Sequence, residues 1–439
     1  MKSLKTIAVA GFLATALGQA AFATDHVYVT GSTAFRTAAI NAISAAVGLA
    51  GPTGDDTNIS GTGKTTYIWE GGTDPVTSNP VTVCATFTGS ASGVGIVATS
   101  TAIPFLPDGS TGHNNPSAYD DSAGTTPHAG YAKTIPDFAF SDVYQSSTPF
   151  NTNAGYTDLS GNDSIVGIVT FKWMASKNFP RGTGVATATT LPSSYNVTPS
   201  FIKQLFSTGA APLSFLSGNS ADQHVEIFAT GRNPDSGTRI TTFADGLYGL
   251  TNVVKQYHPT VSGGAVTSQS LYPVETIYGL LGTGSVGNSG EASGGNLRAF
   301  LQATLPTSGL TGQNAGCTGA YYITYLGIGD ASSVEGSSTN LTGAVELTYG
   351  GVQYSNTAIQ QGQYSFWSYE HVLDRGDLAP AGGAAGTEAA TDIETTMVST
   401  IQGWNSTNAN ISGSGLQDDS NMKVKRSGDG LFIKPKFTF

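Results

Sequence analysis

The apolar positions of this chain fall into short blocks with two different spacings. Residues 225–229 (VEIFA) are mostly apolar and form a plausible strand. After a short polar stretch, Ile240, Phe243 and Leu247 recur at i, i+3 and i+7. This spacing predicts a helix with one buried stripe, ending at a glycine cap at Gly249. A strand followed by a helix is the repeating unit of an α/β fold.

The same alternation recurs along the chain. Strands are predicted at residues 26–30, 81–88, 136–142 and 320–327, and helices at residues 36–47, 198–206, 294–300 and 393–404. Two longer stretches differ, because residues 51–80 and most of residues 94–134 are rich in glycine and polar residues and are predicted to be loops or a surface insertion.

Residues 165–175 form a continuous apolar run. A run of this length predicts a strand that is buried on both faces or crosses between two domains. Residues 363–373 are the predicted return crossing. The chain ends in an alternating stretch that Pro435 interrupts, which favours a closing strand or tail of an α/β protein over a barrel strand.

Small polar residues follow the predicted strands. The clearest case is residues 231–239 (GRNPDSGTR), where a strand turns through Ser, Gly and Thr into a helix. The backbone N–H groups and the positive dipole at a helix start attract anions. Arg232 adds a guanidinium that can bond two oxygens of one oxyanion. A capped helix start with a surface arginine is the alternative interpretation of this stretch alone.

The first residues have the pattern of a secretory signal. Lys2 and Lys5 precede a short apolar region, and Ala21-Phe22-Ala23 supplies a cleavage pattern. We therefore expect residues 1–23 to be a signal peptide and the mature protein to be periplasmic or extracellular. No later stretch is apolar enough to predict a transmembrane helix.

Composition narrows the possible partners. The formal net charge of −11 argues against nucleic acid and against an anionic membrane surface as partners. The two cysteines, Cys84 and Cys317, are predicted to be buried free thiols, although a disulfide remains possible. The six histidines are scattered without metal-ligand spacing, so no metal site and no cofactor is predicted.

Four motifs resemble those of the periplasmic phosphate-binding component of ABC transporters, within the type 2 periplasmic solute-binding proteins. Its T-G-x-x-x-T-F turn is similar to residues 30–35 (TGSTAF), which have one residue fewer, and its G-S-S-G-G turn to residues 89–93 (GSASG). Its D-F-x-x-S-D motif is matched at residues 137–142 (DFAFSD). Its R-x-D-G-S-G-T motif resembles residues 232–238 (RNPDSGT), with the same spacing from Arg to Thr. Residues 295–300 and 322–327 are similar to two later motifs of the same family, a G-N-x-x-x-A-F helix and a G-x-I-G-Y strand.

The resemblance implies a two-lobed α/β fold, each lobe a mixed sheet flanked by helices, with the ligand in the cleft between them. Lobe 1 would comprise residues 24–164 plus 361–439, and lobe 2 residues 165–360. Residues placed around one bound phosphate by the resemblance are Ser32, Thr33, Phe35 through its N–H, Ser90, Asp142, Arg232, Ser236, Gly237 and Thr238. The shortened first turn leaves the choice between Ser32 and Thr33 open.

Asp142 has the chemistry to select phosphate. Phosphate keeps a proton near neutral pH, because its second pKa is about 6 by analogy with phosphoesters. A carboxylate can accept the hydrogen bond of that proton, whereas sulfate has none to offer and would be repelled. The sequence departs from the family at Pro234, where the family has an aspartate, and at Arg36, where it has a proline. These departures bear on affinity and on the choice of oxyanion.

The resemblance therefore implies a non-enzymatic, monomeric protein that captures inorganic phosphate, or a similar tetrahedral oxyanion, and delivers it to an ABC permease in the inner membrane. Two alternatives stay open. One is a surface or extracellular protein that keeps the fold without transport. The other is an exported phosphatase-type hydrolase using Ser236 or Ser90, but no G-x-S-x-G elbow occurs.

Overall fold

The computed structural model describes residues 24–59, 64–110, 112–113, 132–180, 195–275, 285–336, 343–378, 387–404 and 419–436. The predicted signal peptide, residues 1–23, lies outside the described residues. None of the helices in the described ranges combines the length and apolarity needed to cross a membrane.

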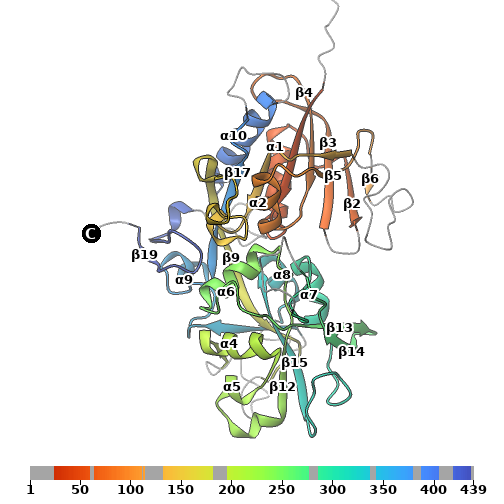
Figure 1. Cartoon of the computed structure of the whole chain (residues 1–439), viewed down its shortest axis with the longest axis vertical. Coiled ribbons are helices and arrows are strands. Elements are labelled where there is room, and N and C mark those ends of the chain that lie inside the picture. The colour runs from red at the N-terminus through yellow and green to blue at the C-terminus, as the bar shows by residue number, and fades with distance from the viewer. Residues whose placement is uncertain are drawn as a thin grey trace, which may run out of the picture.

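The protein consists of two α/β parts that share one long strand (Figure 1). This strand, β9 (Asp163–Ala175), pairs through its first half with β17 (Trp367–Asp374) and through its second half with β15 (Gly319–Gly327) and β16 (Val345–Tyr349). The strand order of the large mixed sheet is β11-β12-β15-β9-β17-β8-β1-β4-β3-β2-β6. The mixed α/β fold with helix-flanked sheets expected from the sequence is confirmed, as is the long apolar strand at residues 165–175.

The upper part in Figure 1 is built on three parallel strands, β1 (Asp25–Gly31), β4 (Pro80–Thr86) and β8 (Phe138–Ser141). Phe138 and Phe140 of β8 face the core that contains α1 (Arg36–Ala46) and α10 (Thr387–Gly403). Ala139 faces the opposite side and packs against α2 (Ser90–Ala98). Helices therefore cover both faces, as expected where strands are parallel.

The lower part is built on β12 (Val225–Ala229) and β15, which are parallel. Its other strands are β10 (Asn196–Val197), β11 (Ala210–Pro212) and the hairpin of β13 (Tyr257–Ser262) and β14 (Ala265–Leu271). Its helices are α4 (Pro199–Thr208), α5 (Ser214–Ser217), α6 (Gly237–Asp245), α7 (Gly294–Leu301) and α8 (Ile328–Val334), and the short α9 (Asn356–Gln360) precedes β17. The predicted N-cap of α4 is confirmed, since the Thr198 side chain accepts the Phe201 N–H at 3.2 Å.

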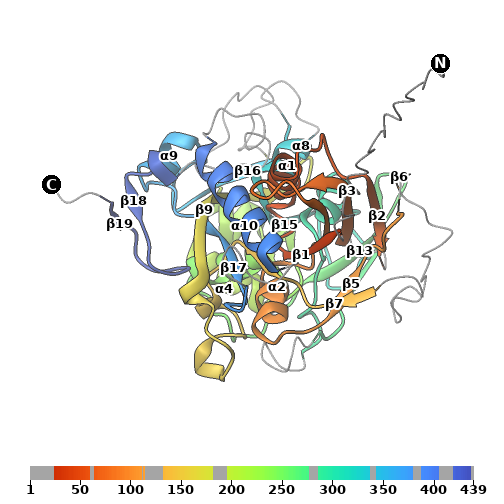
Figure 2. The ribbon, with the colours of Figure 1, turned by 90° about the horizontal axis from the view of Figure 1, so that it is seen from above.

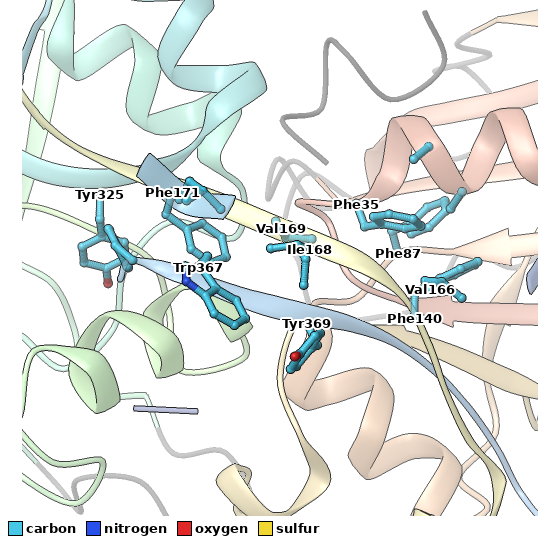
Figure 3. Packing of buried hydrophobic residues seen from close by; sticks show 14 of the residues in the cluster. Phe35, Phe87, Phe140, Val166, Ile168, Val169, Phe171, Tyr325, Trp367 and Tyr369 are labelled. Atoms are coloured by element: carbon cyan, nitrogen blue, oxygen red, sulfur yellow. The ribbon is translucent and has the colours of Figure 1, made fainter. Parts of the chain in front are cut away.

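Aromatic side chains fill the junction along the shared strands. In Figure 3, Phe171 of β9 lies on the side of Tyr325 of the lower part, Trp367 of β17 lies toward Tyr369, and Val166 lies toward Phe140 of the upper part. These side chains belong to one continuous buried cluster. The core therefore runs through the junction without interruption, and its burial holds the two parts together.

Residues 51–80 are not the loop that the sequence predicts. They contain β2 (Gly54–Ile59) and β3 (Lys64–Thr73), which pair with each other, and β3 also pairs with β4. Trp69 of β3 is fully buried and donates its indole N–H to Ser44 of α1 at 2.9 Å. These strands lie toward one edge of the sheet, next to β6 (Gly112–His113). Their polar and glycine-rich composition resembles that of a loop, so the sequence pattern did not indicate strands.

Three smaller predictions also need correction. Leu247 is 67% exposed with φ +52°, because α6 ends at Asp245 before the buried stripe reaches it. Part of the predicted insertion at residues 94–134 is ordered as the rest of α2 and the small sheet of β5 (Ile103–Phe105) and β7 (Ala132–Thr134), and much of the remainder lies outside the described residues. Cys84 and Cys317 are free, but only Cys84 is buried.

The described chain ends in a hairpin of β18 (Val424–Lys425) and β19 (Lys434–Pro435). Both views place it at the periphery of the molecule (Figures 1 and 2). Its base is fixed to the body: Lys423 donates its backbone N–H to the Gln360 carbonyl at 2.8 Å. Inside the hairpin, Arg426 and Asp429 are buried.

Candidate functional site

Five chain segments that bear the sequence motifs come together at the carboxyl ends of their strands. Three belong to the upper part: the turn after β1 with Thr33, the start of α2 with Ser90, and the turn after β8 with Asp142. Two belong to the lower part: Arg232 after β12, and the start of α6 at Gly237. Ligands of α/β proteins bind at this end of the sheet.

Asp142 lies at the centre of this group and is 1% exposed. Ser90 Oγ donates a short hydrogen bond to its Oδ1, and Thr238 Oγ1 donates to its Oδ2 at 3.3 Å. Burial raises the pKa of Asp142, while the bond from Ser90 and the charge of Arg232 act in the opposite direction. The carboxylate therefore joins a residue of the upper part to one of the lower part.

The start of α6 is pressed against this carboxylate. A β-carbon on Gly237 would lie 1.7 Å from Asp142 Oδ1, so only glycine fits here. Ser236 caps the helix by accepting the Arg239 N–H at 3.3 Å. The start of α2 is joined to the same segment, because Ala91 donates its backbone N–H to the Asp235 carbonyl at 3.0 Å. Two positive helix ends thus meet beside Asp142.

Arg232 brings a guanidinium to the same place and is 3% exposed. One terminal nitrogen donates to Thr33 Oγ1 at 2.9 Å and to the Ala292 carbonyl at 2.8 Å, and Nε donates to the Glu291 carbonyl at 3.1 Å. Burial lowers the pKa of Arg232, although Asp142 and Asp330 counteract this. The side chain of Arg232 is thus held in the lower part while it bonds a hydroxyl of the upper part.

The hydrogen bonds of the first turn distinguish between Ser32 and Thr33 as the candidate ligand residue. Thr33 is partly exposed and bonds Arg232, whereas Ser32 is fully buried and its hydroxyl accepts the Phe35 N–H at 3.2 Å. Ser32 thus acts locally at the start of α1. The Phe35 N–H is already bonded, and the Phe35 ring packs on Phe140 with the centroids 5.3 Å apart. The contacts favour Thr33 over Ser32, and the direct ligand role of Phe35 stays a prediction.

Several residues that support Arg232 were not found from the sequence. Arg239 is buried and donates to the Arg232 carbonyl at 3.0 Å and to the Asn288 carbonyl at 2.6 Å. Asn233 donates its N–H to the Glu291 carbonyl at 3.0 Å, so residues 288–292 run alongside the arginine loop. Most of these contacts use backbone carbonyls, which leave no residue signature. Asn296, in a motif that the sequence did single out, bonds Glu291 at 2.9 Å.

Glu370 is a second buried carboxyl group near Asp142. It precedes His371 on β17, and His371 pairs with Ser141. The strand register therefore brings Glu370 beside Asp142. Neither carboxyl oxygen of Glu370 has a hydrogen-bond partner among the described residues. Burial, and then the charge of Asp142, raise the pKa of Glu370 well above its usual range. Burial therefore favours the neutral form of Glu370 over the charged form.

Four of the described histidines have hydrogen-bond partners other than the two candidate nucleophiles, Ser90 and Ser236. Hydrogen bonds join His26 to Asp108, His224 to Gln223, His258 to Glu291 and His371 to Asp163. None of these four described histidines bonds Ser90 or Ser236. Burial, a carboxylate, a guanidinium and two helix starts together instead form a site suited to a protonated oxyanion.

The fold and the site thus define a two-part α/β protein with a candidate oxyanion site at the meeting of loops from both parts. No family model matches the sequence, and no curated protein matches it. Solved structures similar to the chain include a substrate-binding protein of a phosphate ABC transporter from Clostridium perfringens with bound phosphate. It is 10% identical, with a TM-score of 0.41, over 90% of this chain and 99% of that chain.

Two others are PstS from Borrelia burgdorferi and an ABC-type phosphate transport receptor from Vibrio cholerae. The first is 11% identical with a TM-score of 0.37, over 90% of this chain and 98% of that chain. The second is 12% identical with a TM-score of 0.42, over 89% and 99%.

Proposed function

We propose that this chain is an exported solute-binding protein that holds inorganic phosphate between its two parts and delivers it to an ABC permease. The observation that carries the proposal is the convergence of Asp142 and Arg232, both buried, at the starts of α2 and α6. The lobe boundaries, residues 24–164 plus 361–439 and 165–360, belong to this proposal, as do the monomeric state and the periplasmic location.

Binding would exchange the contacts that now close the site. The hydroxyls of Ser90 and Thr238, which donate to Asp142, would turn to the oxygens of the anion. Arg232 would exchange its bond to Thr33 for bonds to the same anion, and Asp142 would accept the proton of the phosphate. Ser236 and the N–H groups at Gly237 would supply the remaining donors. Such an exchange requires the two parts to separate and close again by hinge motion.

Calorimetric titration of the purified protein with phosphate, and separately with sulfate, tests this proposal. We expect saturable binding of one phosphate per chain and no heat with sulfate at the same concentration and ionic strength. Absence of heat with phosphate would favour a protein that keeps the fold without the transport role. Turnover of a phosphomonoester by the pure protein would favour a hydrolase.

A further inference from the structure

The C-terminal hairpin, defined as residues 423–436, has a charge opposite to that of the rest of the protein. It contains five Lys or Arg residues and one acidic residue, in a chain with a formal net charge of −11. The single acidic residue, Asp429, is buried and accepts the backbone N–H of Tyr144 at 2.9 Å. Lys423, Lys425 and Lys434 are exposed. The outer surface of the hairpin is therefore basic.

Two large apolar side chains lie on the same hairpin. Phe432 is 88% exposed, the highest value of any large hydrophobic residue described, and its neighbour Leu431 is 53% exposed. They lie in the connection between β18 and β19, next to Lys434. A phenylalanine this exposed loses the free energy of burial unless another surface covers it.

The base of the hairpin is held rigidly, so its outer surface is presented in a fixed place. Arg426 is buried and lies over the Trp367 ring, 4.0 Å from its centroid. Its guanidinium also forms an ion pair with Asp245 of α6 at 3.4 Å. Arg426 thus makes buried contacts within the protein, and the exposed positive charge of the hairpin comes from its lysines. Gly430 lies against the backbone of Ala244.

The types of exposed residue favour a lipid surface over a protein partner. Protein interfaces are enriched in arginine and depleted of lysine, whereas the only arginine of the hairpin is buried. A lipid surface needs no defined geometry from its basic groups, and an aromatic side chain inserts between the headgroups. Each lysine near an anionic lipid surface strengthens binding about fivefold. Three exposed lysines therefore supply a factor on the order of a hundredfold.

We propose that the C-terminal hairpin binds the surface of an anionic lipid membrane, with Phe432 inserted among the headgroups and Lys423, Lys425 and Lys434 against the lipid phosphates. The acidic body would be repelled from the same surface. The membrane would consequently be contacted at this one place, with the protein in a defined orientation. This inference does not depend on the identity of the ligand in the oxyanion site.

Co-sedimentation of the purified mature protein with vesicles tests the proposal. We expect binding to vesicles that contain phosphatidylglycerol, weak binding to pure phosphatidylcholine, and release at high salt. Replacing all three lysines by glutamine should weaken binding on the order of a hundredfold. Phe432→Ser should weaken it without changing the salt dependence. Protein that stays in the supernatant with every vesicle would overturn the proposal and leave a protein partner as the explanation of the patch.

Matched control variants distinguish an effect of the hairpin on vesicle binding from an effect of the overall charge of the protein. The triple variant Lys133→Gln, Lys203→Gln, Lys255→Gln removes the same charge elsewhere, and Phe215→Ser removes another exposed phenylalanine, which is 57% exposed. Both should bind vesicles like the parent. Equal losses in the control and hairpin triples would also overturn the proposal. In Phe432→Trp, the added fluorescence should shift to shorter wavelength with anionic vesicles, and an unchanged spectrum would contradict insertion.

Discussion

A β-carbon placed on Gly237 would lie 1.7 Å from Oδ1 of Asp142 and 2.8 Å from the β-carbon of Ser90. The first turn of α6, from the lower part, is therefore in direct contact with two residues of the upper part. This contact depends on the absence of a side chain at position 237. The closed arrangement of the site consequently tolerates no larger residue there.

Gly237→Ala should weaken phosphate binding about tenfold to a hundredfold, because the start of α6 has to move away from Asp142. It should also lower the free energy of unfolding by about 1–3 kcal/mol, as overpacked sites do. Calorimetric titration and chemical denaturation measure the two effects. Gly403→Ala, at a glycine with no atom within 4 Å of the added carbon, should change neither. Parent-like phosphate affinity in Gly237→Ala would remove the start of α6 from the site.

Arg232→Ala should weaken phosphate binding on the order of a hundredfold or more, because a charged bidentate donor is lost and Asp142 keeps its charge without compensation. Arg232→Lys keeps the charge but loses the planar fork, so an intermediate loss is expected. Titration of both variants with phosphate gives the comparison, and circular dichroism checks that each is folded. Unchanged affinity in the alanine variant would mean that Arg232 serves only to join Thr33 to residues 291–292.

Asp142→Asn should change the preference for phosphate over sulfate by about tenfold to a hundredfold, because an amide can donate to sulfate where the carboxylate repels it. Competition between the two anions measures this ratio directly. Asp330→Asn is the matched control, since Asp330 lies near Arg232 but does not bond Ser90. Removing the charge of Asp330 should change the affinities for phosphate and sulfate by similar factors. An unaltered ratio in Asp142→Asn would show that the carboxylate is not the acceptor of the phosphate proton.

Glu370→Gln should stabilise the protein at neutral and alkaline pH. The pKa of Glu370 is raised by burial and by Asp142, so the folded state holds its proton more tightly than the unfolded state does. Folding is therefore opposed increasingly as the pH rises above about 4.3, the ordinary pKa of a glutamate. The uncharged glutamine removes this opposition, so its stabilising effect should increase with pH.

Thermal unfolding of Glu370→Gln and its parent across pH 4 to 8 checks this expectation. The difference in stability should be small at the acid end and grow with pH. A constant difference across the pH range would mean that Glu370 titrates alike in the folded and unfolded states.

Most of the elements that carry the site motifs could be predicted from the sequence, because these motifs join a strong local pattern to a marked turn. Residues 225–229 and the helix after Ser236 are examples. β3 could not be predicted, since its burial depends on pairing with β4 and on α1 packing against Trp69. α2 was also hidden, because Gly93 and Gly95 are poor helix formers that are nevertheless fixed in place by close packing.

In the candidate site, too, some residues could be predicted from the sequence and others could not. The motifs indicated Asp142 and Arg232 because the required chemistry belongs to their side chains. The carbonyls of Glu291 and Ala292 that hold Arg232 could not be found this way, since any residue supplies a carbonyl. Glu370 was missed because its place beside Asp142 follows from the register of β17 on β8, which a sequence does not display.

The shared strand β9 limits the ways in which the molecule can open. Its backbone is hydrogen-bonded to neighbours in both parts, and β17 shifts register against it between Glu370 and His371. Sliding would break these ladders, whereas twisting a narrow β ribbon leaves them intact. If the two parts move as the proposed function requires, the motion would therefore be a change of angle between the loops that carry Asp142 and Arg232, without sliding along β9.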